Sequence, residues 1–457
     1  MTGQSIDEVG FEEAERNSLR RVASLRTELE DITEVEYRQL RLERVVLVGV
    51  WTEGTAEDAE NSLAELKLLA ETAGSDVLDA LLQRRQKPDP ATFIGRGKVE
   101  ELREAVEATG ADTIICDGEL APSQMRNLED RTKVKVVDRT ALILDIFAQH
   151  AKSAEGKAQV ELAQLQYQTQ RLRGWGGNLS RQAGGRAAGG EGIGGRGPGE
   201  TKLETDRRRI QAKMAKLRRE LKELRVTRDI KKAQRRRNAV PAVAIAGYTN
   251  AGKSSLLNRL TGAGVLVEDA LFATLDPTTR RTQTSDGRIY TLSDTVGFVR
   301  HLPHQIVEAF RSTLEEVADA DLVLHVVDGS HADPQGQLAA VREVFAEVGA
   351  SQVPEIVVVN KADAADPLVL KQLLAAEPHA VVVSARTGEG IDELLSAIEA
   401  DLPRPATRIE VVVPYSRGDL LSQVHETGEI ESLEHAEDGT HVVARVSDDL
   451  AHQLQSL

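Results

Sequence analysis

The stretch Gly247-Tyr248-Thr249-Asn250-Ala251-Gly252-Lys253-Ser254, followed by Ser255, decides how this 457-residue sequence is interpreted. It follows the apolar run Val243–Ala246 and leads into Ser255–Leu260, which has helical character. Its glycines let backbone N–H groups curl around phosphate oxygens, and the N-terminus of the helix adds a positive dipole. In such a loop the lysine reaches the β- and γ-phosphates, while the serine hydroxyl after it binds Mg²⁺. The pattern therefore predicts a nucleotide-binding phosphate loop rather than a chance strand–turn–helix.

A second motif, Asp294-Thr295-Val296-Gly297, follows the predicted strand Ile289–Leu292. We expect the Asp294 carboxylate to hold Mg²⁺ through a water molecule. The N–H of Gly297 can contact the γ-phosphate, because glycine lets the loop swing in close. Many turns contain such a pattern by chance, so its weight comes from its distance after the phosphate loop.

A third motif, Asn360-Lys361-Ala362-Asp363, follows the predicted strand Ile356–Val359 and favours guanine over adenine. The Asp363 carboxylate can accept hydrogen bonds from N1–H and N2–H of guanine, a donor pair that adenine lacks. A buried polar site of this kind can discriminate by ~10⁴–10⁵, because the wrong base leaves it unpaired. We expect Lys361 to pack its stem over the base and Asn360 to tie this loop to the phosphate loop.

A weaker motif, Ser384-Ala385-Arg386, follows the predicted strand Ala380–Val383. A backbone N–H there could bind O6 of guanine, and a helix N-cap is the alternative interpretation.

A switch loop is predicted between the first two motifs, in Phe272-Ala273-Thr274-Leu275-Asp276. Such a loop needs one threonine that binds both Mg²⁺ and the γ-phosphate. We favour Thr274, with Thr278 and Thr279 as alternatives. Mg²⁺ is the predicted cofactor, with Ser254 and Thr274 as direct ligands. The predicted catalytic residues are Lys253, Thr274 and Gly297.

Composition limits the class of protein. The single cysteine, Cys116, excludes an internal disulfide and a cysteine metal cluster, and it fits a reducing cytosol. The acidic N-terminus has no apolar core for a signal peptide, and no apolar run is long enough to span a bilayer. We therefore expect a cytoplasmic protein without a membrane span.

Charge is unevenly distributed along the chain. The formal net charge is −16, yet Lys202–Asn238 contains sixteen Lys or Arg against five Asp or Glu, a net charge of +11. The remainder of the chain therefore sums to −27. Such asymmetry indicates a segment that faces nucleic acid, although a solvated helix face is the more common meaning of a charge run.

Residues 155–239 are predicted to form an antiparallel helical hairpin. The first helix, 155–173, has an apolar seam with spacings of 4, 3, 4 and 3, at Ala158, Leu162, Leu165, Thr169 and Leu172. The second, 200–238, has a matching seam at Ile210, Met214, Leu217, Leu221 and Leu224. Two such seams joined by one loop favour paired helices. The joining loop, 174–199, holds twelve glycines with Arg181, Arg186 and Arg196, and we expect it to be a flexible tip.

Two α/β regions flank the hairpin. Residues 42–154 predict a small parallel α/β domain, with strands at Val45–Val50, Thr113–Cys116 and Val134–Val137. Residues 240–402 give a longer α/β pattern that contains every nucleotide motif. Residues 403–457 form a small acidic α/β module, and residues 1–41 a polar extension. The predicted fold class is α/β, with a P-loop GTPase domain between these N-terminal parts and the C-terminal module.

With these motifs in place, the chain resembles the HflX family of ribosome-associated GTPases, in the wider group of Obg-HflX-like P-loop GTPases. The resemblance covers roughly residues 44–457. Besides the nucleotide motifs, it rests on Phe93-Ile94-Gly95-Arg96-Gly97-Lys98, Val137-Asp138-Arg139-Thr140 and the stretch Arg196–Arg208. In that family the Phe-Ala-Thr-Leu-Asp-Pro stretch is the first switch, which supports Thr274 as an Mg²⁺ ligand.

The resemblance implies a GTPase that binds the large ribosomal subunit and acts in ribosome splitting or rescue under stress. It implies that the hairpin 155–239 contacts ribosomal RNA, with the loop 174–199 reaching the peptidyl-transferase region. Ribosomal proteins are expected partners of the C-terminal module, and the protein is expected to be a cytoplasmic monomer that associates with ribosomes. Some members also hydrolyse ATP through the N-terminal region, but residues 44–150 contain no phosphate-loop motif.

Phe298 follows Gly297, where many signalling GTPases carry a Gln that orients the attacking water. Phenylalanine cannot do this, so we hypothesise that the isolated protein hydrolyses GTP slowly and that a ribosomal partner completes the site. Nearby candidates for a supporting role are Arg280, Arg281, Arg300 and His301. Two alternatives stay open: a factor in which GTP gates RNA remodelling or subunit assembly, and a protein–protein switch.

Overall fold

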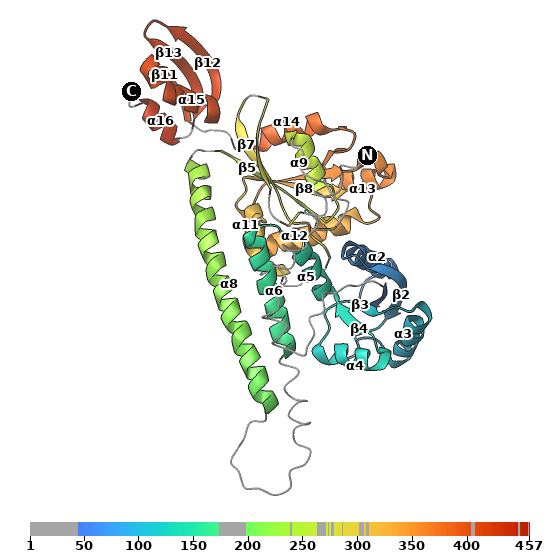
Figure 1. The fold of residues 1–457 in the computed structure, drawn as a ribbon. Coiled ribbons are helices and arrows are strands. Elements are labelled where there is room, and N and C mark those ends of the chain that lie inside the picture. Colours follow the sequence, from blue (N-terminus) through green and yellow to red (C-terminus); the bar gives the residue numbers. More distant parts are fainter. Residues whose placement is uncertain are drawn as a thin grey trace, which may run out of the picture.

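The computed structural model describes residues 44–172, 198–237 and 240–457, apart from 263–270, 273, 276–277, 286, 301–305, 308–309, 404–406, 447 and 456. Within these residues the chain forms three β-sheets and a pair of long helices (Figure 1). The predicted extension 1–41, and the three arginines of the predicted tip loop, lie outside the described residues.

The central sheet has six strands in the order β10-β9-β8-β5-β7-β6. All pair in parallel except β6, which runs antiparallel to β7. The strands are β5 (Ala242–Gly247), β6 (Thr279–Gln283), β7 (Ile289–Asp294), β8 (Leu322–Asp328), β9 (Glu355–Asn360) and β10 (Val381–Val382). The helices are α9 (Lys253–Thr261), α11 (Arg311–Ala318), α12 (Pro334–Val348), α13 (Pro367–Ala376) and α14 (Ile391–Asp401). Each strand predicted before a nucleotide motif is present.

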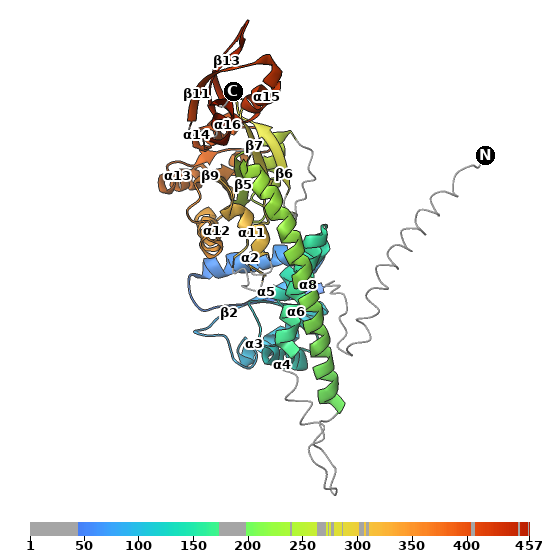
Figure 2. The same ribbon diagram turned by 90° about the vertical axis from the view of Figure 1, so that its left-hand side faces the viewer.

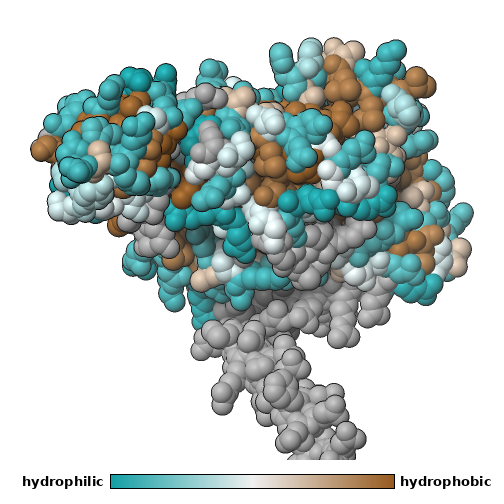
Figure 3. All heavy atoms as spheres, turned by 90° about the horizontal axis from the view of Figure 1, so that it is seen from above, coloured by the Kyte–Doolittle hydropathy of each residue, from teal (hydrophilic) through white to brown (hydrophobic). Residues whose placement is uncertain are grey.

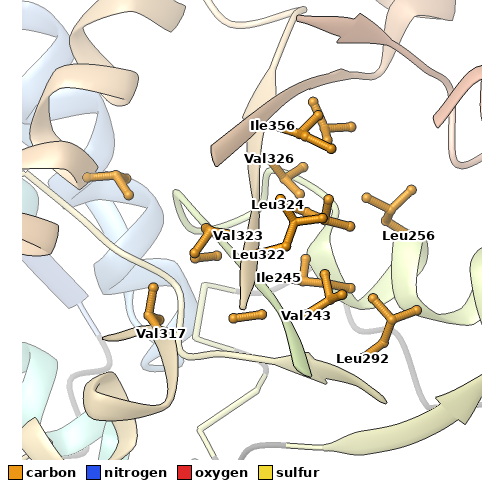
Figure 4. Packing of buried hydrophobic residues seen from close by; sticks show 14 of the residues in the cluster. Val243, Ile245, Leu256, Leu292, Val317, Leu322, Val323, Leu324, Val326 and Ile356 are labelled. Carbon is orange, nitrogen blue, oxygen red and sulfur yellow. The ribbon is translucent and has the colours of Figure 1, made fainter. Parts of the chain in front are cut away.

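The core of this sheet forms because its central strands are apolar on both faces. Every residue of β5 is buried, and so is every residue of β8 except the last, Asp328. Parallel strands covered by helices on both faces have this composition. Figure 4 shows the packing of Val243, Ile245, Leu256, Leu292, Leu322, Leu324 and Val326. This core holds the carboxyl end of β5, where the phosphate loop begins.

The N-terminal sheet is parallel throughout, in the order β2-β1-β3-β4. Its strands are β1 (Arg44–Trp51), β2 (Asp76–Arg84), β3 (Thr113–Asp117) and β4 (Lys135–Asp138). Its helices are α2 (Ala56–Thr72), α3 (Arg96–Thr109), α4 (Pro122–Thr132) and α5 (Arg139–His150). The predicted small parallel α/β domain is confirmed, while β2 and α5 are elements that the sequence pattern did not indicate.

Helices α6 (Ala154–Leu172) and α8 (Pro198–Arg237) run side by side and antiparallel, as predicted (Figures 1 and 2). With 40 residues at 1.5 Å each, α8 is about 60 Å long. The seam consists of Ala158, Leu162 and Leu165 against Ile210, Met214, Leu217 and Leu221. The prediction that Leu224 belongs to it is wrong, because α8 continues past the start of its shorter partner and leaves Leu224 37% exposed.

The C-terminal module is a three-stranded antiparallel sheet in the order β11-β13-β12. Its strands are β11 (Thr407–Val413), β12 (Glu429–Ala436) and β13 (Gly439–Val446), and its helices are α15 (Gly418–Thr427) and α16 (Asp448–Gln455). The helices pack on the sheet through Leu420, Val424, Leu450 and Leu454. The module therefore has its own small core, and β12 was not predicted.

A shared hydrophobic cluster joins the N-terminal sheet to the central domain. Phe147 of α5 makes edge contacts with Phe272 and Phe310, with ring centroids 4.6 and 4.7 Å apart. The same cluster includes Leu275 and Val296. Apolar side chains from both predicted switch segments are thus buried against the N-terminal domain.

The outer surface is mostly polar. On the face seen from above, hydrophilic side chains predominate and hydrophobic ones form small groups (Figure 3). Three exposed large hydrophobic side chains, Leu224, Val226 and Ile230, lie on α8, and others such as Leu68 of α2 and Leu368 of α13 come from separate elements. In the part of the chain that the structure describes, no helix is both long and apolar enough to cross a membrane.

Candidate functional site

The phosphate loop turns sharply between β5 and α9. Gly247 has φ +150°, and a Cβ there would clash with the carbonyl oxygen of Val326, so only glycine fits. Gly252 has φ +89° and caps α9, whose first residue is Lys253. The Lys253 Nζ donates to the carbonyl oxygen of Tyr248 at 2.8 Å. Burial lowers the pKa of Lys253 to about 8, although the nearby Asp294 carboxylate acts in the opposite direction.

Three oxygens meet at the start of α9. The Ser254 hydroxyl lies 2.9 Å from the Thr274 hydroxyl and donates to Oδ2 of Asp294 at 2.6 Å. Adjacent ligands of an octahedral Mg²⁺ also lie about 2.9 Å apart, because each is 2.0–2.1 Å from the ion. Among the described residues Oδ1 of Asp294 has no hydrogen-bond partner, and burial raises the pKa of this carboxyl. A cation beside these three side chains would satisfy both features.

The rival threonines lie elsewhere. The Thr279 hydroxyl lies 2.9 Å from the Ser293 hydroxyl within the β6–β7 pair. The carbonyl oxygen of Thr278 accepts from the N–H of Asp294 at 3.0 Å. Of the three threonines considered, the structure brings Thr274 to Ser254.

The segment after β7 is joined to the phosphate loop by backbone hydrogen bonds. The N–H of Thr249 donates to the carbonyl oxygen of Phe298 at 2.7 Å, and the N–H of Phe298 donates to that of Gly247 at 3.2 Å. A Cβ on Gly297 would lie 2.7 Å from Cγ2 of Thr249 and 3.1 Å from Nζ of Lys253. The Phe298 side chain is buried in the core near Phe345 rather than directed at the phosphates.

The guanine motifs are arranged around one loop. The Asn360 side chain donates to the carbonyl oxygen of Ala251 at 2.8 Å and accepts from the N–H of Ala385 at 3.0 Å. It therefore ties the third motif to the phosphate loop, as expected from the sequence. The Ser384 hydroxyl donates to Asp363 at 2.5 Å, and Arg386 forms an ion pair with the same carboxylate. These contacts lower the pKa of Asp363, with the Ser384 hydrogen bond as the main cause.

The remaining motif residues contact neighbouring loops or are buried between the domains. Lys361 adopts φ +61°, and its Nζ contacts Oδ2 of Asp328 at 2.8 Å. The Thr295 hydroxyl donates to the carbonyl oxygen of Ile245 at 2.9 Å. The side chains of Phe272, Leu275 and Val296 are buried in the shared cluster, so only their backbone can face a nucleotide. Ala273 and Asp276 lie outside the described residues.

The basic residues considered for a supporting role in hydrolysis lie on different elements. Arg280 and Arg281 are exposed on β6. Arg300 forms an ion pair with Asp333, at the start of α12. His301 lies outside the described residues. Among the described residues, no hydrogen bond joins the side chain of any of these three arginines to the phosphate loop, although the backbone N–H of Arg300 contacts Tyr248.

A buried polar cluster between the N-terminal and central domains was missed by the sequence interpretation. The Tyr248 hydroxyl donates to Glu65 of α2 and accepts from the N–H of Arg300 at 2.6 Å. Arg139 forms ion pairs with Glu65 and with Asp117, the latter at 2.7 Å, and donates to the carbonyl oxygen of Arg300 at 3.0 Å. The available signal was the charged pair Asp138-Arg139 directly after a buried strand.

Four family models match the chain in succession. The models described as "GTP-binding GTPase N-terminal" and "GTP-binding GTPase Middle Region" match residues 60–148 and 150–235. Those described as "50S ribosome-binding GTPase" and "HflX C-terminal domain" match residues 242–361 and 369–456. GTPase HflX of Lacrimispora saccharolytica is 46% identical over 94% of this chain and 98% of its own length. The chain belongs to the HflX family.

Other HflX proteins give the same result. GTPase HflX of Escherichia coli is 42% identical over 87% of this chain and 92% of its own length. Among solved structures, a GTP-binding protein from Sulfolobus solfataricus in complex with GDP is 26% identical, with a TM-score of 0.41, over 79% of this chain and 98% of that one. As a member of the HflX family, the chain is a GTP-binding P-loop GTPase.

Proposed function

We propose that GTP binds across the loop Gly247–Ser255, with its base between Asp363 and Ser384–Arg386. The observation that supports this most is Asn360, which bonds both the phosphate loop and the Ser384–Arg386 loop. Lys253 would move from the carbonyl oxygen of Tyr248 to the phosphates. Asp363 forms an ion pair with Arg386 in the described arrangement. When guanine binds, its N1–H and N2–H would replace the Arg386 guanidinium as donors to this carboxylate.

We propose Mg²⁺ as the cofactor, with Ser254 and Thr274 as direct ligands and Asp294 acting through a water molecule. The 2.9 Å spacing of the two hydroxyls and the unpartnered Oδ1 of Asp294 support this. When bound, the ion would neutralise charge on the β- and γ-phosphates. The chain's part is to hold the loop around Thr274 and the N–H of Gly297 against the γ-phosphate.

We propose that the protein acts on the large ribosomal subunit. The family model over residues 242–361 is described as "50S ribosome-binding GTPase". The described part of α8 exposes a series of basic side chains, Arg207, Arg209, Lys216, Arg218, Arg219 and Lys222. A row of exposed cations along a helix suits a phosphate backbone. The hairpin and the loop 174–199 would contact ribosomal RNA, and the C-terminal module would contact ribosomal protein.

We propose further that the ribosome stimulates hydrolysis and that the activity serves ribosome splitting or rescue by a monomeric factor. The buried position of Phe298 supports the first part, because no side chain at that position can orient the attacking water. A GTP-gated assembly or RNA-remodelling factor is the alternative. It would bind precursor subunits and would leave assembled ribosomes intact.

Sedimentation with purified large subunits tests this function. We expect binding with a non-hydrolysable GTP analogue, weaker binding with GDP, and a steep loss of affinity with salt. The double variant Arg218→Glu/Arg219→Glu on α8 should bind less tightly and with a shallower salt dependence. Lys371→Glu, on exposed α13, is the matched control and should bind like the original chain. Binding that ignores both salt and the α8 variant would refute the RNA interaction.

A further inference from the structure

Charged residues fill the carboxyl edge of the N-terminal sheet. Asp117 ends β3, Asp138 ends β4, and Arg139 is the first residue of α5. The Arg139 side chain is only 3% exposed. Burial opposes its charge, but Glu65 and Asp117 more than compensate, so the pKa of Arg139 is raised. Both terminal nitrogens of this buried cation are bonded, while its Nε has no hydrogen-bond partner among the described residues.

One arm of this arrangement reaches the nucleotide site. Arg139 donates to the carbonyl oxygen of Arg300, while the Tyr248 hydroxyl accepts from the N–H of the same residue. Both backbone groups of Arg300, three residues after Gly297, are therefore bonded to this cluster. Burial, followed by the charge of Glu65, raises the pKa of Tyr248, so its hydroxyl stays protonated and continues to donate to Glu65.

The other arm reaches the hairpin. Asp138 accepts from the Tyr167 hydroxyl at 2.7 Å and from Arg171 at 2.6 Å, both on α6. The Arg171 guanidinium also lies over the Tyr167 ring, 4.1 Å from its centroid. Helix α6 ends at Leu172, one residue after Arg171 and just before the segment predicted to form the tip. The hairpin is thus bonded to the residue directly before Arg139.

We propose that Glu65 and Arg139 of the N-terminal domain are positioning residues of the GTPase site, and that Asp138 couples them to helix α6. This rests on the proposed function, because the signal carried would be contact of the hairpin with the large subunit. A displacement of α6 moves Asp138, and with it Arg139, since the two are adjacent at the start of one rigid helix. Arg139 and Glu65 then shift Arg300, three residues after Gly297, and Tyr248 of the phosphate loop.

Partial movement of such a cluster is unfavourable. A buried charge that loses one partner keeps its full desolvation cost, so arrangements that satisfy only part of the cluster are disfavoured. Coupling between sites requires an element of this kind, whose equilibrium both sites can bias. A static interdomain contact is the competing explanation, and it predicts no effect of the hairpin on Arg300.

Two substitutions at opposite ends of the cluster test the coupling. Glu65→Gln keeps an acceptor for Tyr248 but removes the charge that holds Arg139, and Arg171→Gln frees Asp138 from one α6 contact. The matched controls are Glu71→Gln, on the exposed part of α2, and Lys157→Gln, on the exposed face of α6. Each variant is checked for folding by circular dichroism. Its affinities for a GTP analogue and for large subunits are measured separately.

The main measurement is single-turnover GTP hydrolysis at saturating nucleotide, with and without saturating large subunits. We expect both variants to reduce the stimulation ratio by about 5-fold or more, the lower end of typical allosteric coupling. The double variant should lose no more than either single variant, whereas both controls should retain the original ratio. Unchanged ratios, or losses that multiply in the double variant, would overturn the proposal.

A second measurement separates this proposal from the proposed function. If large subunits neither bind nor stimulate the original chain, the proposed function fails, and the coupling is then judged without ribosomes. Hydrogen exchange at the Arg300 amide should accelerate in Tyr248→Phe, which removes its acceptor, and also in Arg171→Gln. Exchange that accelerates in Tyr248→Phe but is unchanged in Arg171→Gln would show a static contact and refute the coupling.

Discussion

Two parallel sheets in this chain use their carboxyl edges in opposite ways. In open parallel sheets, ligands bind beyond the carboxyl ends of the strands, near the point where strand order reverses. In the central sheet, β5 ends in Gly247 and leads to a loop of backbone N–H groups. In the N-terminal sheet, β3 and β4 end in Asp117 and Asp138, followed by the buried Arg139, and the edge is occupied by Tyr248 of the other domain.

The difference shows that the residues after a strand, and not its place in the sheet, decide what an edge can bind. Glycine at Gly247 and Gly252 keeps side chains away, so an anion can approach the backbone. Paired carboxylates and an arginine leave no such space, and they satisfy each other within the protein. One edge is built for a nucleotide, and the other for docking the domain that holds it.

The largest expected effect comes from changing Asp363, the proposed base contact at the carboxyl edge of the central sheet (the open edge). Asp363→Asn replaces a carboxylate that accepts twice with an amide that accepts once and donates once. GTP affinity should fall by about 10³-fold or more, because one guanine N–H loses its acceptor. Xanthosine triphosphate, which has an oxygen at C2, should bind this variant better than GTP does. Equilibrium titration with fluorescent analogues of both nucleotides measures whether the variant binds xanthosine triphosphate more tightly than GTP.

The control for that experiment is Asp366→Asn, three residues along the chain. Asp366 caps α13 by accepting from the N–H of Leu368 at 2.7 Å and makes no contact with the Ser384 loop in the described structure. Its base preference should remain that of the original chain. If Asp363→Asn still prefers GTP, the assignment of guanine to this edge is wrong.

The carboxyl edge of the N-terminal sheet, with Asp117, Asp138 and Arg139, is the filled edge. A substitution there should change the stability of the fold rather than ligand binding. Arg139→Met keeps the length of the side chain but leaves Glu65 and Asp117 buried without their cation. Such a loss costs about 3–5 kcal/mol of unfolding free energy. Urea unfolding followed by the fluorescence of Trp51, at the end of β1, measures it in a chain with Trp175→Phe.

An exposed arginine in the same domain provides the comparison for this variant. Arg103 of α3 pairs with Glu100 and Glu107 and is 39% exposed. Arg103→Met should leave the unfolding free energy almost unchanged, because exposed ion pairs contribute little. Equal losses for Arg103→Met and Arg139→Met would mean that the edge is not held by its buried pair.

A smaller effect is expected from a histidine inside the central sheet. His325 of β8 is 1% exposed, and its Nδ1 lies 2.5 Å from Glu355. Burial lowers its pKa despite that carboxylate. The unfolded chain takes up a proton near pH 6.5 that the folded chain resists, so stability should fall as pH drops below about 6.5, by at most ~1.4 kcal/mol per pH unit.

Unfolding free energies at pH 7.5 and 5.5 measure this dependence. His325→Gln should reduce the difference between the two pH values. His441→Gln should preserve it, since the His441 side chain is 48% exposed and pairs with the exposed Asp438. An unchanged difference in His325→Gln would assign the pH dependence to other groups.

Local patterns predicted the open edge well. The phosphate loop and the motifs at Asp294 and Asn360 come at the ends of buried apolar strands, and the Ser384 motif follows the half-buried β10. Parallel pairing of these strands brings Asn360 and Ser384 toward the phosphate loop. Strand β6, Thr-Arg-Arg-Thr-Gln, was not predicted because it is an edge strand with no apolar face. Strand β2 was not predicted because its apolar residues lack a regular alternation. Helix α5 is largely buried and therefore lacks the polar face of a surface helix.

The filled edge could not be predicted, because its contacts join residues far apart in the chain. Glu65 and Tyr248 are 183 positions apart, and Arg139 and Arg300 are 161 apart. Nothing local in Phe272 shows that it adopts φ +59° and packs on Phe147 instead of facing the nucleotide. Such contacts depend on how two separate sheets dock, which periodicity and motif spacing do not encode.

We propose that the open edge hydrolyses GTP under control of the large ribosomal subunit. Single-turnover hydrolysis of GTP, with and without saturating purified large subunits at low and high salt, tests it most directly. We expect slow hydrolysis by the free protein, strong acceleration by large subunits, and loss of that acceleration at high salt. Fast hydrolysis by the free protein that large subunits do not change would contradict the claim.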